Sequence, residues 1–193
     1  MTADPVSLLS RATDQAAAII SNVSHEQAGR PTPCPGWTVG RLIDHIIDDL
    51  RQFTVSARGG KANFSSPPKI DDWDDAFERD QAELLDAWRS AGDLTGTMDL
   101  PHIGTVPKRF PVDQATAEFA THTWDLAKAT NQAPTLDPEI ALASLEWARG
   151  ALRDEYRSDE PGATFGRAIN VADDAPPYDR LAGFFGRNPA DWP

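Results

Sequence analysis

Residues 111–131 read PVDQATAEFATHTWDLAKATN, and this stretch decides the fold class. It begins with a proline, which suits the first turn of a helix, and its apolar residues then recur every three or four positions. This spacing predicts a helix over 111–131 with one face against a hydrophobic core. Two members of that face, Glu118 and His122, are ionisable, so the same helix is a candidate for carrying a functional site.

Helical spacing also dominates the rest of the chain. Starts marked by a proline or a polar N-cap, each followed by apolar residues at helical intervals, predict helices over 5–23, 38–57, 72–92 and 138–152 and a short one near 177–186. Residues 98–110, around Gly104, have the pattern of an irregular hairpin. We therefore expect an all-α protein, an antiparallel four-helix bundle with a small irregular hairpin and an extended C-terminal tail that ends in a short helix.

Length and charge narrow the domain organisation and the classes of partner. The 193 residues suit a single domain over 1–193, with its core at about 5–152 and the tail, 153–193, packed on it. The formal net charge is −12, and the Lys and Arg residues are scattered, so nucleic acid and anionic membranes are poor partners. We expect a cytoplasmic protein, because no stretch resembles a secretion signal or a membrane helix and the single Cys34 fits a reducing compartment. Small molecules are the expected partners, and a homodimer is left open.

The residues with the clearest chemical potential are Glu118, His122 and His45. Glu118 and His122 are four residues apart, so both side chains project from one face of a helix, one turn apart. His45 lies in the apolar stripe of the predicted helix 38–57 and would supply a third ligand from a facing helix. One carboxylate and two imidazoles suit a divalent ion such as zinc or nickel, and three protein ligands leave a coordination position open.

The alternative is a structural core pair. An unpaired buried charge costs several kcal/mol, so Glu118 and His122 would then be hydrogen-bonded to each other, with His45 an ordinary helix histidine.

Other polar and aromatic residues fit structural roles. Cys34, between two prolines, is expected to be a small buried filler rather than a nucleophile or a metal ligand. Trp37 and Trp124 are expected to be packing anchors beside the metal-binding helices. Asp125 would either orient a metal-bound group or be a surface acid or a partner of Arg41. The same ambiguity holds for Asp48 and Asp49. We expect His25 and His102 to lie in loops. The acidic cluster is expected to be a solvated helix start, and it consists of Asp71, Asp72, Asp74 and Asp75.

Three longer motifs carry a resemblance to a known family. They are PTPCPGWTVGRLIDHI at 31–46, EFATHTWDLAKATN at 118–131 and APPYDRLAGFFGRNP at 175–189. On these motifs the chain resembles the DinB-like superfamily, and within it the actinobacterial proteins related to the N-terminal domain of mycothiol-dependent maleylpyruvate isomerase. The resemblance implies a four-helix bundle that binds a divalent metal through a histidine on the second helix and an acid-x-x-x-His pair on a later one. Those roles fall on His45, Glu118 and His122.

The resemblance also implies a range of functions. The first is a metal-dependent thiol transferase or isomerase-like enzyme with zinc, or else nickel, as the ion and mycothiol as cosubstrate. A metal-dependent hydrolase and a non-enzymatic metal-binding or stress-related bundle are the alternatives. Maleylpyruvate isomerisation itself is not the expected reaction, because the separate C-terminal domain of that enzyme is not recognised in this sequence.

Overall fold

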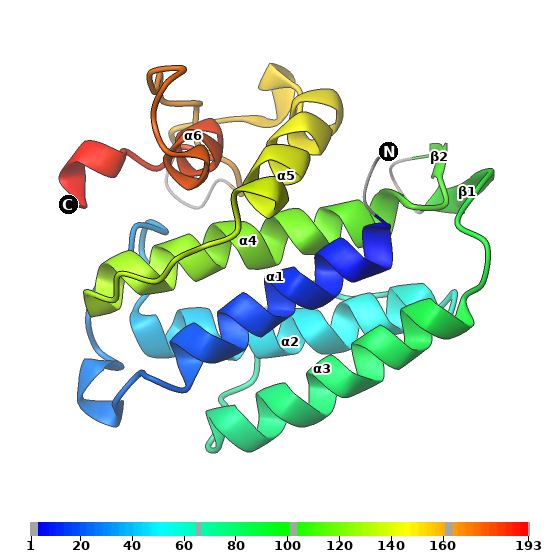
Figure 1. Cartoon of the computed structure of the whole chain (residues 1–193), viewed down its shortest axis with the longest axis horizontal. Coiled ribbons are helices and arrows are strands. Elements are labelled where there is room, and N and C mark those ends of the chain that lie inside the picture. The colour runs from blue at the N-terminus through cyan, green and yellow to red at the C-terminus, as the bar shows by residue number, and fades with distance from the viewer. Residues whose placement is uncertain (1–3, 65–66, 101–103, 161–163, 193) are drawn as a thin grey trace.

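The computed structural model of the protein describes residues 4–64, 67–100, 104–160 and 164–192. The described chain is mostly helical, with one small two-stranded sheet (Figure 1). Its α-helices are α1 (Pro5–Ile20), α2 (Val39–Ala57), α3 (Trp73–Ser90), α4 (Phe110–Thr130), α5 (Pro138–Ala151) and α6 (Pro177–Phe184). Three single-turn 3-10 helices, η1 (His25–Gln27), η2 (Asp154–Tyr156) and η3 (Pro189–Asp191), and the strands β1 (Thr97–Leu100) and β2 (Gly104–Pro107) complete the elements.

Polar caps begin the helices close to where the sequence predicts. The Thr38 side chain accepts a hydrogen bond from the backbone N–H of Arg41 at the start of α2, and Asp72 accepts one from Asp75 at the start of α3. The prediction that α1 continues to residue 23 is wrong, because the helix ends at Ile20. Just beyond that end, the side-chain amide of Asn22 donates to the Ala18 carbonyl and offers the backbone an alternative to the helical pattern.

Four long helices enclose the main hydrophobic core. Helix α1 packs against α3 and α4, and α2 packs against the same two helices (Figure 1). Fully buried large side chains fill the space between them, including Leu9, Leu42, Ile46, Leu50, Phe53, Leu84, Phe119 and Leu126. None of the helices that the structure describes is both long and apolar enough to cross a membrane.

The predicted hairpin exists between α3 and α4. Strands β1 and β2 pair in antiparallel register, with Met98 opposite Val106 and Leu100 opposite Gly104. The strands end at Pro107, so the hairpin is shorter than the predicted 98–110, and Phe110 already belongs to α4. Residues 101–103, between the two strands in the sequence, lie outside the described residues.

The C-terminal part of the chain covers the outer side of α4. Helix α5 packs on α4, and α6 packs on both α5 and α4 (Figure 1). The indole of Trp124 on α4 donates a hydrogen bond to Asp179 on α6 at 2.8 Å. On α5, Ile140 and Leu145 are buried, whereas Leu142 is 45% exposed.

Candidate metal centre

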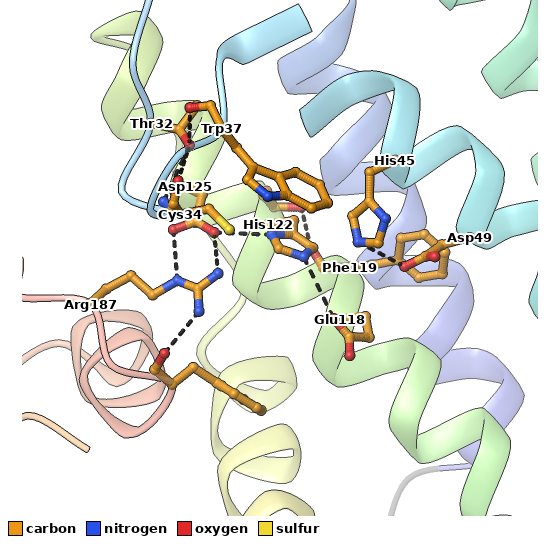
Figure 2. A network of polar contacts seen from close by, with 12 residues as sticks. Thr32, Cys34, Trp37, His45, Asp49, Glu118, Phe119, His122, Asp125 and Arg187 are labelled. Atoms are coloured by element: carbon orange, nitrogen blue, oxygen red, sulfur yellow. Dashed lines mark hydrogen bonds and ion pairs between the residues drawn. The ribbon is translucent and has the colours of Figure 1, made fainter. Parts of the chain in front are cut away.

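The packing of α2 against α4 brings the three predicted ligands together. His45 comes from α2, and Glu118 and His122 come from successive turns of α4 (Figure 2). One potential ligand atom of each residue lies within 4.8 Å of those of the other two. Among the residues that the structure describes, this is the one such group of three or more histidine, cysteine or acidic side chains.

The distances within the group are close to those that one ion requires. A tetrahedral zinc ion with bonds of about 2.1 Å separates its ligand atoms by about 3.4 Å. The Nε2 atom of His122 lies 3.6 Å from Oε2 of Glu118. The His45 and Glu118 side chains are 20% and 27% exposed, whereas that of His122 is 7% exposed. The donor set therefore fits a divalent cation, and its His45 and Glu118 side is partly exposed to solvent.

The electrostatics of His45 favour the form that binds metals. Burial lowers the pKa of His45 to about 3, with His122 and the guanidinium of Arg41 acting in the same direction. The imidazole is therefore neutral at neutral pH, and the neutral ring is the form that coordinates an ion.

A further carboxylate lies behind His45. Oδ2 of Asp49, one turn along α2, is 3.3 Å from Nε2 of His45. Asp49 is 3% exposed, and burial together with the nearby Glu118 and Asp48 holds its pKa well above the usual range. The sequence left the role of Asp49 open, and the structure places it at the edge of the candidate site.

The second ring nitrogen of His122 faces a buried ion pair. Nδ1 of His122 is 3.0 Å from Oδ2 of Asp125, and the guanidinium of Arg187 donates to both carboxylate oxygens of Asp125, at 3.1 and 2.8 Å (Figure 2). Burial raises the pKa of Asp125, but the charge of Arg187 and the hydrogen bonds from His122 and Arg187 outweigh it, so this pKa lies below its usual range. Asp125 is fully buried and pairs with Arg187. The alternative expectation, that Asp125 is a surface acid or a partner of Arg41, is therefore wrong.

The turn before α2 supplies one wall of the site. Residues 31–38 fold back on themselves, with Pro31 paired to Thr38 and the Thr32 hydroxyl bonded within the turn. This places the half-buried Trp37 edge-on to His45, with ring centroids 4.7 Å apart, and parallel to His122 at 6.5 Å. The guanidinium of Arg41 lies 5.0 Å above the same indole.

Cys34, on the same turn, is near the site but is not one of the three grouped ligands. Figure 2 shows it beside Asp125, on the side of His122 away from His45. Burial raises the pKa of the Cys34 thiol to about 11, against a lowering contribution from Arg187. The side chain is therefore an uncharged thiol at neutral pH, and it is only partly buried rather than fully buried as expected.

His25 and the acidic residues near Asp72 lie on elements other than the two helices that carry the site. His25 is on the single-turn helix η1, where its ring stacks on Trp73 at 5.4 Å. His102 lies outside the described residues. Asp71, Asp72, Asp74 and Asp75 are exposed around the start of α3, as expected for a solvated helix start.

Comparison with known proteins identifies the family. A family model described as "Mycothiol maleylpyruvate isomerase N-terminal domain" matches residues 9–127. The chain belongs to this family. The mycothiol maleylpyruvate isomerase N-terminal domain family is DinB-like, in agreement with the resemblance noted from the motifs.

Two relatives align with nearly the whole chain, but their names assign no activity. Two uncharacterised proteins of Mycobacterium tuberculosis, from strains CDC 1551 / Oshkosh and ATCC 25618 / H37Rv, are each 34% identical to this chain over 184 residues. Each alignment covers 95% of this chain and 98% of the relative. No solved structure matches the chain.

The family match includes most of the candidate site. His45, Glu118, His122 and Asp125 all lie within residues 9–127, whereas Arg187 lies outside them. Sequence reasoning did not select Arg187, although it belongs to the motif at 175–189. The available signal was an arginine shortly after the apolar residues Leu181, Phe184 and Phe185.

Proposed function

We propose that this protein is an enzyme that depends on a divalent metal ion and uses a small-molecule thiol, with mycothiol as the cosubstrate. His45, Glu118 and His122 are the proposed ligands, held in a DinB-like four-helix bundle formed by α1 to α4. Zinc is the first choice of ion and nickel the second, because two imidazoles and one carboxylate suit both. The observation that carries the proposal is the convergence of three ligand atoms from two helices within 4.8 Å.

The geometry favours an ion over a simple core pair. At 3.6 Å, Nε2 of His122 and Oε2 of Glu118 are too far apart for a hydrogen bond, so the pair does not satisfy itself. The ring of His45 meets that of His122 at 84° with centroids 5.1 Å apart, although the two residues come from different helices. Two imidazoles and a carboxylate whose ligand atoms lie within 4.8 Å of one another are explained by a shared cation better than by mutual bonding.

The bound ion would supply Lewis-acid chemistry, which lowers the pKa of a coordinated thiol or water and makes it a nucleophile at neutral pH. The chain's own residues would define the space around that nucleophile. Trp37 shields the two histidines from solvent on one side, and the exposed edges of His45 and Glu118 leave the other side accessible. The guanidinium of Arg41, above the Trp37 ring, places a positive charge near the proposed metal site.

The choice of mycothiol rests on the family. The matching family model bears the name of a mycothiol-dependent isomerase domain, and three protein ligands leave a position for a thiol sulfur. We also propose a cytoplasmic location, because a thiol cosubstrate has to stay reduced. The reaction type, transfer of the thiol to an electrophile, is the most general step that such a site supports.

A conjugation assay tests the proposal. Zinc-loaded protein is mixed with mycothiol and monochlorobimane, a generic fluorogenic electrophile, and the rate is compared between wild type and His122→Ala, each with and without chelator. We expect a metal-dependent rate in the wild type that is lost in His122→Ala and retained in His25→Ala, a histidine variant outside the site. Glutathione and bacillithiol should react more slowly than mycothiol. The absence of a metal-dependent rate with every thiol would count against the transferase and leave a hydrolase or a binding protein.

One observation favours a second candidate, a metal site with a structural role. Asp49 is close enough to His45 to become a fourth ligand after a small movement, and structural zinc sites are usually closed by four protein ligands.

A further inference from the structure

The C-terminal segment reaches the candidate metal centre through one buried ion pair. Arg187, which follows α6, is 8% exposed, and its guanidinium forms two hydrogen bonds with the fully buried carboxylate of Asp125. The same carboxylate accepts from Nδ1 of His122, one of the proposed ligands. In Figure 2 the three side chains form a continuous chain of polar contacts that leads from Arg187 to the ring of His122.

We infer that Asp125 and Arg187 are positioning residues for the metal centre: Arg187 holds Asp125 in place, and Asp125 fixes the ring of His122 so that Nε2 faces Glu118 and His45. This inference rests on the proposed metal site. It extends that site to a pair of residues that does not itself contact the ion, one of them supplied by the C-terminal segment.

The hydrogen bonds fix which nitrogen of His122 is available. Arg187 donates to both oxygens of Asp125, so this carboxylate is the acceptor at its contact with His122, and Nδ1 of His122 is the donor and carries a proton. The remaining nitrogen, Nε2, is then the one that can bind a metal, and it is the nitrogen 3.6 Å from Glu118. A carboxylate bonded to the second nitrogen of a ligating histidine fixes the tautomer and the ring orientation in this way, and raises the basicity of the ligand.

Arg187 is itself fixed by the turn that follows α6. Its Nη1 donates to the carbonyl of Phe185 at 2.8 Å, and its backbone N–H donates to Ala182. Gly186, directly before it, has φ of 84°, and a Cβ atom there would lie 3.1 Å from the carbonyl oxygen of Arg167. The tight turn therefore needs a glycine, and it directs the guanidinium onto Asp125 with each of its three nitrogens hydrogen-bonded.

Burial makes the pair unlike an ordinary surface salt bridge. A carboxylate with no exposed surface is strongly destabilising when it loses its partner, so the position of Asp125 depends on its two hydrogen bonds from Arg187. Without the arginine, the carboxylate is expected to lose its fixed orientation or to turn away from the core. Either change weakens the hydrogen bond that orients His122.

Arg157 offers a matched control on the same part of the chain. It is also 8% exposed, and it donates to the carbonyls of Gly166 and Phe184 while its guanidinium packs over the Phe184 ring at 4.4 Å. It therefore anchors the C-terminal segment as Arg187 does, but its hydrogen bonds and ion pair with described residues go to Gly166, Phe184 and Asp154, not to Asp125 or His122. If a variant acts only by loosening the C-terminal segment, replacement of Arg157 and replacement of Arg187 should have equal effects on metal binding.

Cobalt titration of the full chain tests the inference without an activity assay. The dissociation constant for Co²⁺ and the visible d–d spectrum of the bound ion are measured for wild type, Arg187→Met, Asp125→Asn and Arg157→Met, with circular dichroism to confirm folding. We expect Arg187→Met and Asp125→Asn to weaken binding by about 10–100-fold and to shift the d–d bands, and Arg157→Met to stay within about threefold of wild type. Arg187→Lys, which keeps the charge but not the two-pronged contact, should restore part of the affinity, and it replaces Arg187→Met if that variant does not fold.

The outcomes separate this inference from the proposed function. Unchanged affinity and spectrum in Arg187→Met, or an equal loss in Arg187→Met and Arg157→Met, would overturn the positioning role while the metal site stands. Failure of the wild type to bind Co²⁺ would overturn the metal site itself, and the positioning role with it.

Discussion

Nε2 of His45 lies 3.3 Å from Oδ2 of Asp49, one helical turn later on α2. This contact places a buried carboxylate next to a proposed metal ligand without including it in the group of three whose ligand atoms are mutually within 4.8 Å. Whether Asp49 joins the coordination decides between an open site, which can accept a substrate, and a closed structural one.

Replacement of Asp49 tests that choice. Because His45, Glu118 and His122 already supply three ligand atoms, Asp49→Asn should leave the zinc affinity within about threefold of wild type. The affinity is measured by competition with a chromogenic chelator, and Asp48→Asn, a change to the neighbouring acid at 9% exposure, is the matched control. A loss of tenfold or more in Asp49→Asn alone would mean that Asp49 is a fourth ligand, as in a structural site.

Removal of the metal should destabilise the fold only in part. The core between α1, α2, α3 and α4 buries many large apolar side chains that do not contact the site, so chelation should leave the far-ultraviolet circular dichroism spectrum nearly unchanged. A ligand at a hundred times its dissociation constant adds about 2.7 kcal/mol to the free energy of unfolding. For a chain of this size that corresponds to a fall in Tm of about 5–10 °C in excess chelator. Collapse to a random coil on chelation would instead show that the ion is needed for folding.

Cys34 should react slowly with alkylating reagents. Burial raises the pKa of its thiol to about 11, and the thiolate is the reactive form, so at pH 8 few molecules carry it. The rate of carbamidomethylation, followed by mass spectrometry, should increase as the pH rises toward 11. The same protein unfolded in urea serves as the control and should react much faster at pH 8. Equal rates in the folded and unfolded protein at pH 8 would show that Cys34 is accessible and ionised, and would reopen a role for it as a nucleophile.

Local patterns account for what could be predicted from the sequence. The start of α2 at Thr38 and the shared face of Glu118 and His122 follow from capping and from the 3.6-residue period, which involve only near neighbours in the chain. His45 was selected because it lies in an apolar stripe and because the motif around it resembles a known family. The mostly helical character followed from the same periodicity.

Long-range contacts account for most of what was missed. Arg187 pairs with Asp125 across 62 positions of sequence, and the segment that carries it has little periodicity, so no local rule connects the two residues. The early end of α1 reflects a side-chain hydrogen bond from Asn22 that competes with the apolar spacing.

The amount of metal bound tests the central claim most directly. Wild type and the triple variant His45→Ala, Glu118→Ala, His122→Ala are loaded with zinc, dialysed, and compared by elemental mass spectrometry, with Asp74→Ala, Asp75→Ala as a control for binding to surface acids. The account predicts about one zinc ion per chain in wild type and in the surface control and almost none in the triple variant. Equal zinc content in wild type and in a folded triple variant would contradict it.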